Sequence, residues 1–235
     1  MTTTLVTGAN KGLGMETARR LVEAGHEVYV GARDPGRGKA AARRTGARFL
    51  PIDVTSDDSV RAAAKILAEE ASTLDVLVNN AGVRGTAAPP GEVTATDMLA
   101  VYDTNVFGAV RVTGAMLPLL QRSAAPVIVN VSSGLGSLAV TADPEAHAEV
   151  VPVWVPALPY NSAKAALNMV TAQYAHAYPS IRVNAVDPGF TATDLNDHAG
   201  EQTVEQGAEI IVRMALIGAE GPTGGYFGNN GVVPW

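Results

Sequence analysis

Cysteine is absent from the 235 residues of this chain. Without thiols the chain forms no disulfide, holds no iron–sulfur cluster and offers no thiolate ligands to zinc. Histidine is scarce as well, and none of the four histidines stands in a metal-binding spacing such as His-Glu-x-x-His. We therefore expect a function that requires no metal ion.

Positive charge is also in short supply. The 17 basic residues are outnumbered by 23 acidic ones, which gives a formal net charge of -6 and no basic footprint for nucleic acid or an anionic membrane. The most apolar stretch, residues 150–158, contains two prolines and is far shorter than the ~20 residues that span a bilayer. The first residues lack the basic and long apolar segments of a secretion signal. We expect a cytoplasmic protein whose partners include neither nucleic acid nor a membrane.

What the chain does contain is a regular alternation of short β-branched segments with longer alanine-rich segments of helical period. Predicted strands cover residues 3–7, 26–32, 47–52, 74–79, 126–131 and 181–186, and predicted helices cover 13–24, 35–44, 57–71, 97–121 and 160–177. Helices of this length connect neighbouring parallel strands. No repeat, linker or change in composition marks a second domain. We predict one α/β domain, residues 1–235, with a doubly wound parallel sheet that binds ligands at the carboxyl ends of its strands.

Several helix boundaries carry capping signals. Ser56, Thr94 and Thr203 stand where N-caps are expected, and the last two have a side chain three residues later that completes a capping box. Gly25 and Gly46 follow predicted helices as C-caps.

A glycine-rich turn links the first predicted strand to the first predicted helix. In that context glycine lets the backbone approach a pyrophosphate, whose charge meets the free amides of the helix N-terminus. Ordinary strand-to-helix bends also use glycine, so the turn alone leaves a purely structural role open. The residues of this turn that we expect to contact a dinucleotide are Gly8, Asn10, Lys11, Gly12, Leu13 and Gly14.

The end of the second predicted strand indicates which dinucleotide binds. NAD sites place a carboxylate there for the ribose hydroxyls, but this chain has Ala32 followed by Arg33. Arg33 and Lys11 can both bind a 2′-phosphate, and no carboxylate at the strand end repels it. Asp34 could neutralise Arg33, although Pro35 after it favours a role for Asp34 as the cap of the next helix. We predict NADP(H) as the cofactor.

Tyr160 and Lys164 stand four residues apart at the start of a predicted helix, and therefore share one face. A phenol with a pKa of about 10 must lose roughly 3 units, about 4 kcal/mol, to exchange protons readily near neutral pH. One lysine charge at about 4 Å supplies about that energy at an effective dielectric near 20. The spacing alone is a weak signal that two ordinary helix residues explain better, but beside a dinucleotide turn it indicates hydride chemistry with a tyrosine acid.

Five motifs in order along the chain together resemble those of the short-chain dehydrogenase/reductase family. They are Thr7-Gly8-x-x-x-Gly12-x-Gly14, Asn79-Asn80-Ala81-Gly82, Ser132-Ser133, Tyr160-x-x-x-Lys164 and Pro188-Gly189. The resemblance covers essentially the whole chain and implies a Rossmann fold. The glycine turn with Arg33 is most similar to the NADPH-dependent carbonyl reductase branch of that family.

The resemblance implies four catalytic residues. Tyr160 would protonate the carbonyl oxygen, and Lys164 would lower the pKa of the phenol and hold the nicotinamide ribose, roles that agree with acid–base physics. Ser133 would orient the substrate oxygen, since Ser132 should face the opposite way in an extended segment. Asn105 would support a proton-relay water near the lysine, although a lone helical asparagine is otherwise a surface residue.

The resemblance also implies cofactor contacts beyond the glycine turn. The adenine would meet Asp53 and Val54, although Asp53 also fits a plain turn. The remaining implied contacts are Asn80, Ala81 and Gly82 at the adenosine ribose and sheet end, and Pro188, Gly189, Thr191 and Thr193 at the nicotinamide carboxamide.

Tyr160 follows Ser133 by 27 positions, more than in many members of the family. The extra residues imply an insertion at about 138–158, similar to one that borders the substrate mouth in carbonyl reductases and can obstruct the usual oligomer interface. We leave the oligomeric state open. The apolar residues there could either line a substrate pocket or pack locally, and they are Leu138, Val153, Trp154 and Leu158.

We expect an NADPH-dependent reductase of a ketone or aldehyde, with a hydrophobic small molecule as substrate and Tyr160 as the acid. The same residues would serve oxidation of an alcohol, so the direction is open. A dinucleotide-binding regulator without turnover is the alternative, and the complete set of four catalytic residues argues against it. Nucleotide-sugar epimerases fit less well, because such relatives have a longer chain than this one and a different glycine spacing.

Overall fold

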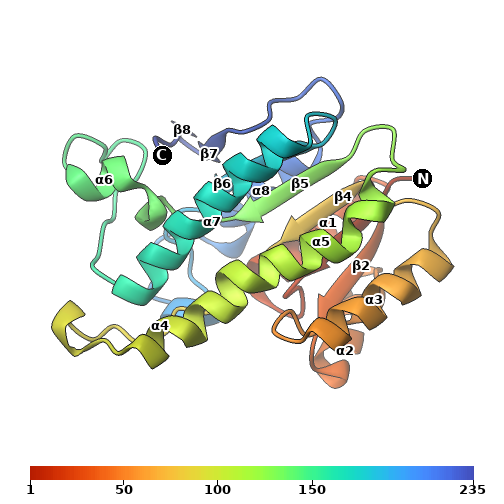
Figure 1. Ribbon diagram of the computed structural model, residues 1–235, viewed down its shortest axis with the longest axis horizontal. Coiled ribbons are helices and arrows are strands. Elements are labelled where there is room, and N and C mark those ends of the chain that lie inside the picture. The colour runs from red at the N-terminus through yellow and green to blue at the C-terminus, as the bar shows by residue number, and fades with distance from the viewer.

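One eight-stranded sheet forms the centre of the computed structural model, which describes residues 1–235 (Figure 1). The strand order is β3-β2-β1-β4-β5-β6-β7-β8, and every neighbouring pair is parallel except β7 with β8. The strands are β1 (Thr3–Thr7), β2 (Glu27–Ala32), β3 (Arg48–Pro51), β4 (Val76–Asn79), β5 (Val127–Val131), β6 (Arg182–Asp187), β7 (Tyr226–Gly228) and β8 (Gly231–Val232). Strand order reverses between β1 and β4, which is where doubly wound folds bind ligands.

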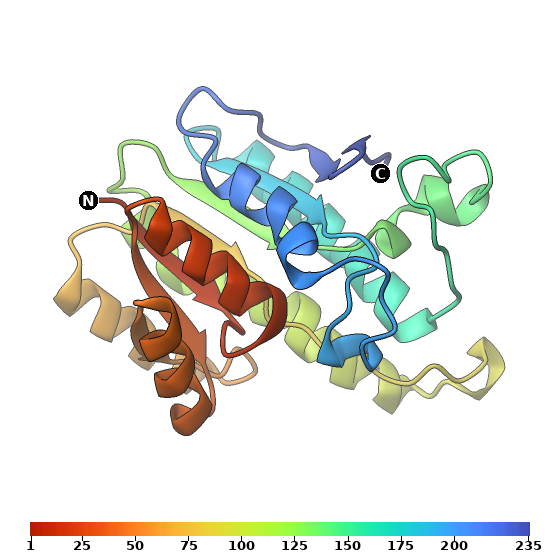
Figure 2. The same ribbon diagram turned by 180° about the vertical axis from the view of Figure 1, so that it is seen from behind.

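Helices cover both faces of the sheet. They are α1 (Gly12–Glu23), α2 (Pro35–Thr45), α3 (Asp57–Glu70), α4 (Ala95–Tyr102), α5 (Gly108–Leu120), α6 (Leu138–Ala142), α7 (Leu158–Ala177) and α8 (Val204–Ala215). Helices α3, α5 and α7 lie on the face turned to the viewer in Figure 1, and α1, α2 and α8 lie on the other face, as Figure 2 shows. This arrangement is the predicted Rossmann fold.

The core has two halves because successive strand residues point to opposite faces. In β1, Leu5 packs with the α3 and α5 side, whereas Val6 packs with the α1 and α8 side. Leu77 and its neighbour Val78 in β4 divide in the same way. Strands buried on both faces are mostly apolar, with a few buried polar side chains such as Asn130 and Asn184, which is why short β-branched runs marked them in the sequence. No helix is long and apolar enough to cross a membrane.

The capping predictions are confirmed. Ser56 accepts a hydrogen bond from the Ser59 amide, and Thr94 and Thr203 each form a complete capping box. Gly25 and Gly46 both adopt positive φ after their helices.

The single helix predicted over residues 97–121 is wrong in one respect. The chain is helical throughout, but a π-helical turn at Asp103–Phe107 separates α4 from α5. Such a turn adds one residue to the helical circuit, and hydrophobic periodicity is too coarse to reveal it.

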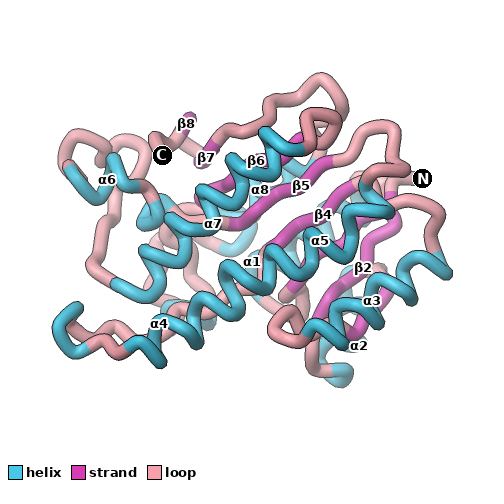
Figure 3. The backbone as a smooth tube through the Cα atoms, viewed as in Figure 1, coloured by secondary structure: helices cyan, strands magenta, loops and turns pink.

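Residues 138–157 form a separate flap beside the carboxyl-terminal end of the chain, as Figure 3 shows. The flap begins with α6, whose first amides include Ala139 N–H donating to the carbonyl of Trp235 at 3.0 Å. Val140 and Val151 of the flap are buried against Tyr226 and Val233. The flap is therefore packed onto the β7–β8 edge of the sheet.

Candidate active site

The glycine turn is shaped by two positive φ angles, +64° at Gly8 and +53° at Gly12. A Cβ atom on Gly8 would lie 2.8 Å from the Cα atom of Ala81, so the turn packs directly against the segment after β4. Helix α1 starts at Gly12, and no side chain caps its first amides. Free amides at a helix N-terminus behind a glycine turn fit the pyrophosphate of a dinucleotide.

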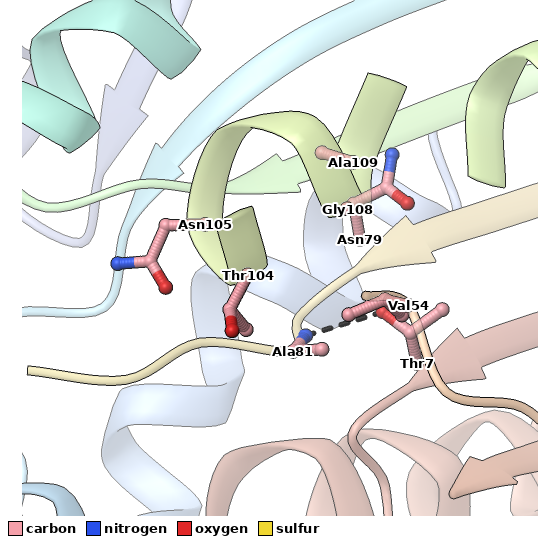
Figure 4. Close-up of a pocket in the computed structure, with 8 residues that line it drawn as sticks. All are labelled: Thr7, Val54, Asn79, Ala81, Thr104, Asn105, Gly108 and Ala109. Carbon is pink, nitrogen blue, oxygen red and sulfur yellow. Dashed lines mark hydrogen bonds between the residues drawn. The ribbon is translucent and has the colours of Figure 1, made fainter. Parts of the chain in front are cut away.

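Thr7 and Asn80 hold that turn in place. The Thr7 hydroxyl accepts hydrogen bonds from the amides of Asn80 at 3.0 Å and Ala81 at 3.1 Å, the second of which is drawn in Figure 4. In return, Asn80 Nδ2 donates to the carbonyl of Thr7 at 2.8 Å. A small pocket opens beside these residues, with Val54 and Asn105 also in its lining. The predicted adenosine contacts therefore gather at the β1–β4 switch.

Arg33 is exposed at the end of β2, and Asp34 turns away from it. The Asp34 carboxylate caps α2 by accepting a hydrogen bond from the Arg37 amide at 2.8 Å, as the sequence indicated. Asp53 accepts hydrogen bonds from Thr55, and these contacts, with the charge of Arg33, lower the pKa of the Asp53 carboxyl. Asp53 thus has the contacts of a turn residue and still lies near Arg33.

Lys11 contacts the segment that follows β6. Its ammonium pairs with Asp194 at 2.6 Å, and both side chains are about half exposed. Thr193 lies over the glycine turn, because a Cβ atom on Gly12 would be 3.6 Å from its methyl group. Thr191 is buried, and its hydroxyl donates to the carbonyl of Pro188 at 3.2 Å. The predicted pyrophosphate and carboxamide contacts therefore face each other across the α1 N-terminus.

Tyr160 and Lys164 lie in the first turns of α7, and the lysine Nζ atom is 5.5 Å from the centre of the phenol ring. Lys164 is only 4% exposed and donates a hydrogen bond to the carbonyl of Val131 at 2.7 Å. Gly82 adjoins both Lys164 and Asn105, since a Cβ atom there would lie 3.8 Å from Nζ and 3.5 Å from the Asn105 Oδ1 atom. The fold thus brings the predicted catalytic residues of α7 and the π-helical turn together.

The electrostatics of the pair differ from the expectation. Burial raises the pKa of Tyr160 to about 12, with the negative charge of Asp187 adding to the rise and the Ser133 hydroxyl opposing it. Burial also lowers the pKa of Lys164 to about 8, against the effect of Asp187. Lys164 is not among the groups that shift the phenol pKa here, because the ammonium is directed at the Val131 carbonyl and desolvation dominates, so its lowering of the phenol pKa stays a prediction.

The two serines after β5 point in different directions, as their positions in an extended segment predicted. Ser132 is 2% exposed and donates to Asn168 Oδ1 at 2.6 Å, toward the interior of α7. Ser133 lies beside the phenol of Tyr160. The structure therefore places Ser133, and not Ser132, at the candidate reaction centre.

Asn105 is 2% exposed in the π-helical turn. Its Oδ1 atom accepts from the Val83 amide at 2.8 Å, and its Nδ2 atom donates to the Val83 carbonyl at 2.9 Å. The side chain thus fixes the backbone that follows Gly82. It is an internal residue and not the surface asparagine that the sequence alone would suggest.

Asp187 is a buried carboxylate that sequence reasoning missed. It is the last residue of β6, 6% exposed, and its Oδ1 atom accepts a hydrogen bond from the Gly189 amide at 3.0 Å. The only available signal was a carboxylate at the end of an apolar strand, directly before the Pro188-Gly189 motif.

Comparison with known proteins agrees with this geometry. The family model for short chain dehydrogenases matches residues 2–204. The short-chain dehydrogenase anuI of Penicillium roqueforti is 37% identical, with 92% of this chain and 88% of that protein covered. (-)-Isopiperitenone reductase of Mentha piperita is 33% identical over 95% of each protein. The crystal structure of NADPH-bound carbonyl reductase from chicken fatty liver matches with a TM-score of 0.86 and 28% identity, over 99% of this chain and 98% of that one. The chain therefore belongs to the short-chain dehydrogenase family of nicotinamide-dependent oxidoreductases.

Proposed function

We propose that this protein is an NADP(H)-dependent reductase that converts a ketone or aldehyde to an alcohol. The observation that carries the proposal is the convergence of Tyr160, Ser133 and Lys164 at the carboxyl ends of the strands, beside a glycine turn with free helix amides. The reductase names of relatives and the NADPH bound to a structural neighbour support it.

The binding residues would hold the cofactor along the switch between β1 and β4. The amides at the start of α1 would receive the pyrophosphate, and the segment from Pro188 to Thr193 would receive the nicotinamide end. Arg33 would bind the 2′-phosphate, for which its guanidinium offers a bidentate contact. Lys11 would join it only by leaving Asp194, with which it is paired in this structure. When bound, NADPH supplies the hydride.

Tyr160 would donate the proton to the carbonyl oxygen. An acid with a pKa of about 12 remains protonated at neutral pH, and the alkoxide it must protonate is far more basic than a phenolate. Oxidation of an alcohol would instead require the phenolate as base, which is scarce at that pKa. The raised pKa therefore keeps Tyr160 in the acid form that reduction uses, while the ratio of reduced to oxidised cofactor would set the direction.

Ser133 and Lys164 would act around that proton transfer. The Ser133 hydroxyl, beside the phenol, would hydrogen-bond the substrate oxygen where negative charge develops. Lys164, with a pKa of about 8, remains mostly charged at neutral pH and would stabilise the phenolate left after donation.

The flap of residues 138–157 corresponds to the insertion expected within the single domain, and we propose that it borders the substrate mouth. Val151 packs against Gly134, next to Ser133, because a Cβ atom on Gly134 would lie 2.5 Å from the valine Cγ2 atom. Leu138 is 71% exposed at the start of the flap and Leu158 is 38% exposed at the start of α7. Apolar side chains beside the reaction centre favour a hydrophobic substrate.

The test is NADPH oxidation with a panel of carbonyl compounds, using Tyr160→Phe and, as a matched control on the same helix, Tyr174→Phe. Loss of the Tyr160 hydroxyl should cut turnover by at least ~10², the usual size of a general-acid contribution. NADPH binding, followed by its fluorescence, should be nearly unchanged in both variants. A wild-type protein that binds NADPH but reduces no member of the panel would favour the regulator alternative.

A further inference from the structure

We propose that Asp187 is a positioning residue of this active site: its carboxylate ties the serine loop to the nicotinamide-binding loop and places a buried negative charge facing Lys164 and Tyr160. The proposal rests on the reductase function above. It gives a role to a carboxylate that is buried at the reaction centre and that the proposed mechanism leaves unused.

The carboxylate bridges two loops that carry different parts of the site. Its Oδ1 atom accepts a hydrogen bond from the amide of Gly189, in the loop expected to bind the carboxamide. Its Oδ2 atom lies against Gly134, where a Cβ atom would approach it to 2.8 Å, close enough for the Gly134 backbone to favour the ionised carboxylate. Gly134 directly follows Ser133. One side chain therefore fixes the serine relative to the nicotinamide end of the cofactor site.

Few groups face this carboxylate. Lys164 and Tyr160 face it from α7, and Tyr226 faces it from β7. On the flap side, Val151 packs against the same Gly134 that contacts Oδ2. No side chain donates a hydrogen bond to the carboxylate, so Lys164 is the only cation that balances it.

The charge opposes the effect of burial on the lysine and reinforces it on the tyrosine. Asp187 raises the pKa of Lys164, whose burial lowers it, and adds to the rise in the pKa of Tyr160. Burial raises the pKa of Asp187 itself, while the backbone groups of the two glycines, together with Lys164, favour its ionised form. The carboxylate thus keeps the protons on both α7 residues, which is the state that a reductase needs before it donates one.

Asparagine separates the charge from the shape of this side chain. Asp187→Asn has nearly the same volume and keeps one acceptor oxygen, but it carries no charge. Asp75→Asn is the matched control, because Asp75 accepts a hydrogen bond from the Thr3 amide at 2.7 Å and one from the Ser123 hydroxyl at 2.5 Å, at the opposite end of the strands.

The first measurement is the alkaline limb of kcat/KM for carbonyl reduction, where activity falls first as Lys164, with a pKa of about 8, loses its proton and then as the Tyr160 phenol does. Removing the negative charge lowers the pKa of both groups, so the limb should move to lower pH by about one unit in Asp187→Asn, the low end for a neighbouring charge. The limb should be unchanged in Asp75→Asn. An unshifted limb in a folded Asp187→Asn protein overturns the proposal, even if kcat falls, because the role would then be structural only.

The second measurement needs no turnover. Tyrosinate absorbance after a rapid pH jump, compared between each protein and its Tyr160→Phe counterpart, isolates ionisation of Tyr160. It should shift to lower pH by the same ~1 unit in Asp187→Asn. A shift in a protein whose wild type shows no turnover would support the proposed role of Asp187 and refute the reductase function. Turnover without a shift would refute only the proposed role of Asp187. If Asp187→Asn does not fold, the same two measurements are made on Asp187→Ser, with the same expected shifts.

Discussion

Replacing Lys164 with methionine should stabilise the protein while it abolishes reduction. The fall in the lysine pKa from 10.5 to about 8 corresponds to about 3 kcal/mol of cost for burying the charged form, at 1.36 kcal/mol per unit. Methionine fills a similar volume without that cost, as apolar replacements of buried charges often do. The comparison is made with Asp187→Asn in both proteins, because methionine alone would leave the Asp187 carboxylate buried without its cation. Wild type in this comparison means the protein that keeps Lys164. Loss of the hydrogen bond to the Val131 carbonyl destabilises the variant by about 1 kcal/mol, which offsets part of this gain. The net gain at neutral pH should be about 2 kcal/mol.

The gain should depend on pH with a definite sign. Below pH ~8, Lys164 is charged in both the folded and the unfolded chain, so the wild type bears the full cost. Between about 8 and 10.5 the folded lysine is neutral and the unfolded one still charged, so wild-type stability rises with pH by about 1.4 kcal/mol per unit. The advantage of Lys164→Met should therefore shrink through that window and vanish by about pH 9.5 to 10.

Urea unfolding at about pH 7 and about pH 9.5 measures the difference, and Lys65→Met is the control. Lys65 has a side chain that is 79% exposed on α3, so its replacement should change the free energy of unfolding little at either pH. A Lys164→Met protein less stable than wild type at pH 7, or a gain independent of pH, would refute the argument that desolvation dominates at this lysine.

The remaining predictions concern specificity and the two serines. Arg33→Ala should raise the NADPH KM about tenfold and leave the NADH KM within about twofold, and equal losses in steady-state kinetics would make Arg33 structural. Trp154→Ala should change the ratio of kcat/KM for bulky over small carbonyls by about tenfold, about 1.4 kcal/mol, with NADPH affinity unchanged; an equal response of both substrate classes would make the flap mere packing. Ser133→Ala should cost about 10²-fold in kcat with stability unchanged. Ser132→Ala should instead cost about 1–3 kcal/mol in urea unfolding, since it strips the buried Asn168 oxygen of its donor, and the reverse pattern would exchange their roles.

Local patterns in the sequence were enough for the parts of the fold that depend on local chemistry. Five of the six predicted strand segments became the central strands β1, β2, β4, β5 and β6, whose buried positions favour apolar and β-branched residues, and the sixth became the mostly exposed edge strand β3. The capping box at Thr203 marked the start of α8 because its hydrogen bonds join residues only three positions apart, so the signal is local. By contrast, β7, β8 and α6 have two to five residues each and depend on contacts between distant segments, such as that of Ala139 with Trp235. No local signal marks elements of that kind.

The candidate site divides along the same line. Spacing placed Tyr160 and Lys164 on one helix face, alternation indicated that only one of the two serines faces the site, and the family resemblance identified it as Ser133. Spacing could not show that the Lys164 ammonium is directed at a strand carbonyl, nor that burial outweighs charge at the phenol. The contact between Asp187 and Gly134 was hidden for the same reason, since these residues stand more than fifty positions apart in the sequence.

The π-helical turn makes the site sensitive to chain length. One extra residue turns the following helix by about 100° and advances it about 1.5 Å. That offset lets α4 contact α7 while α5 contacts α3 and β4. Deleting one residue from Asp103–Phe107 would restore a continuous, regular α-helix. The deletion would also either rotate Asn105 away from Val83 or displace the whole of α4. Substitution of Phe107, 43% exposed in the same turn, removes no residue from the circuit. Evolution can therefore substitute residues in this turn more freely than it can insert or delete them.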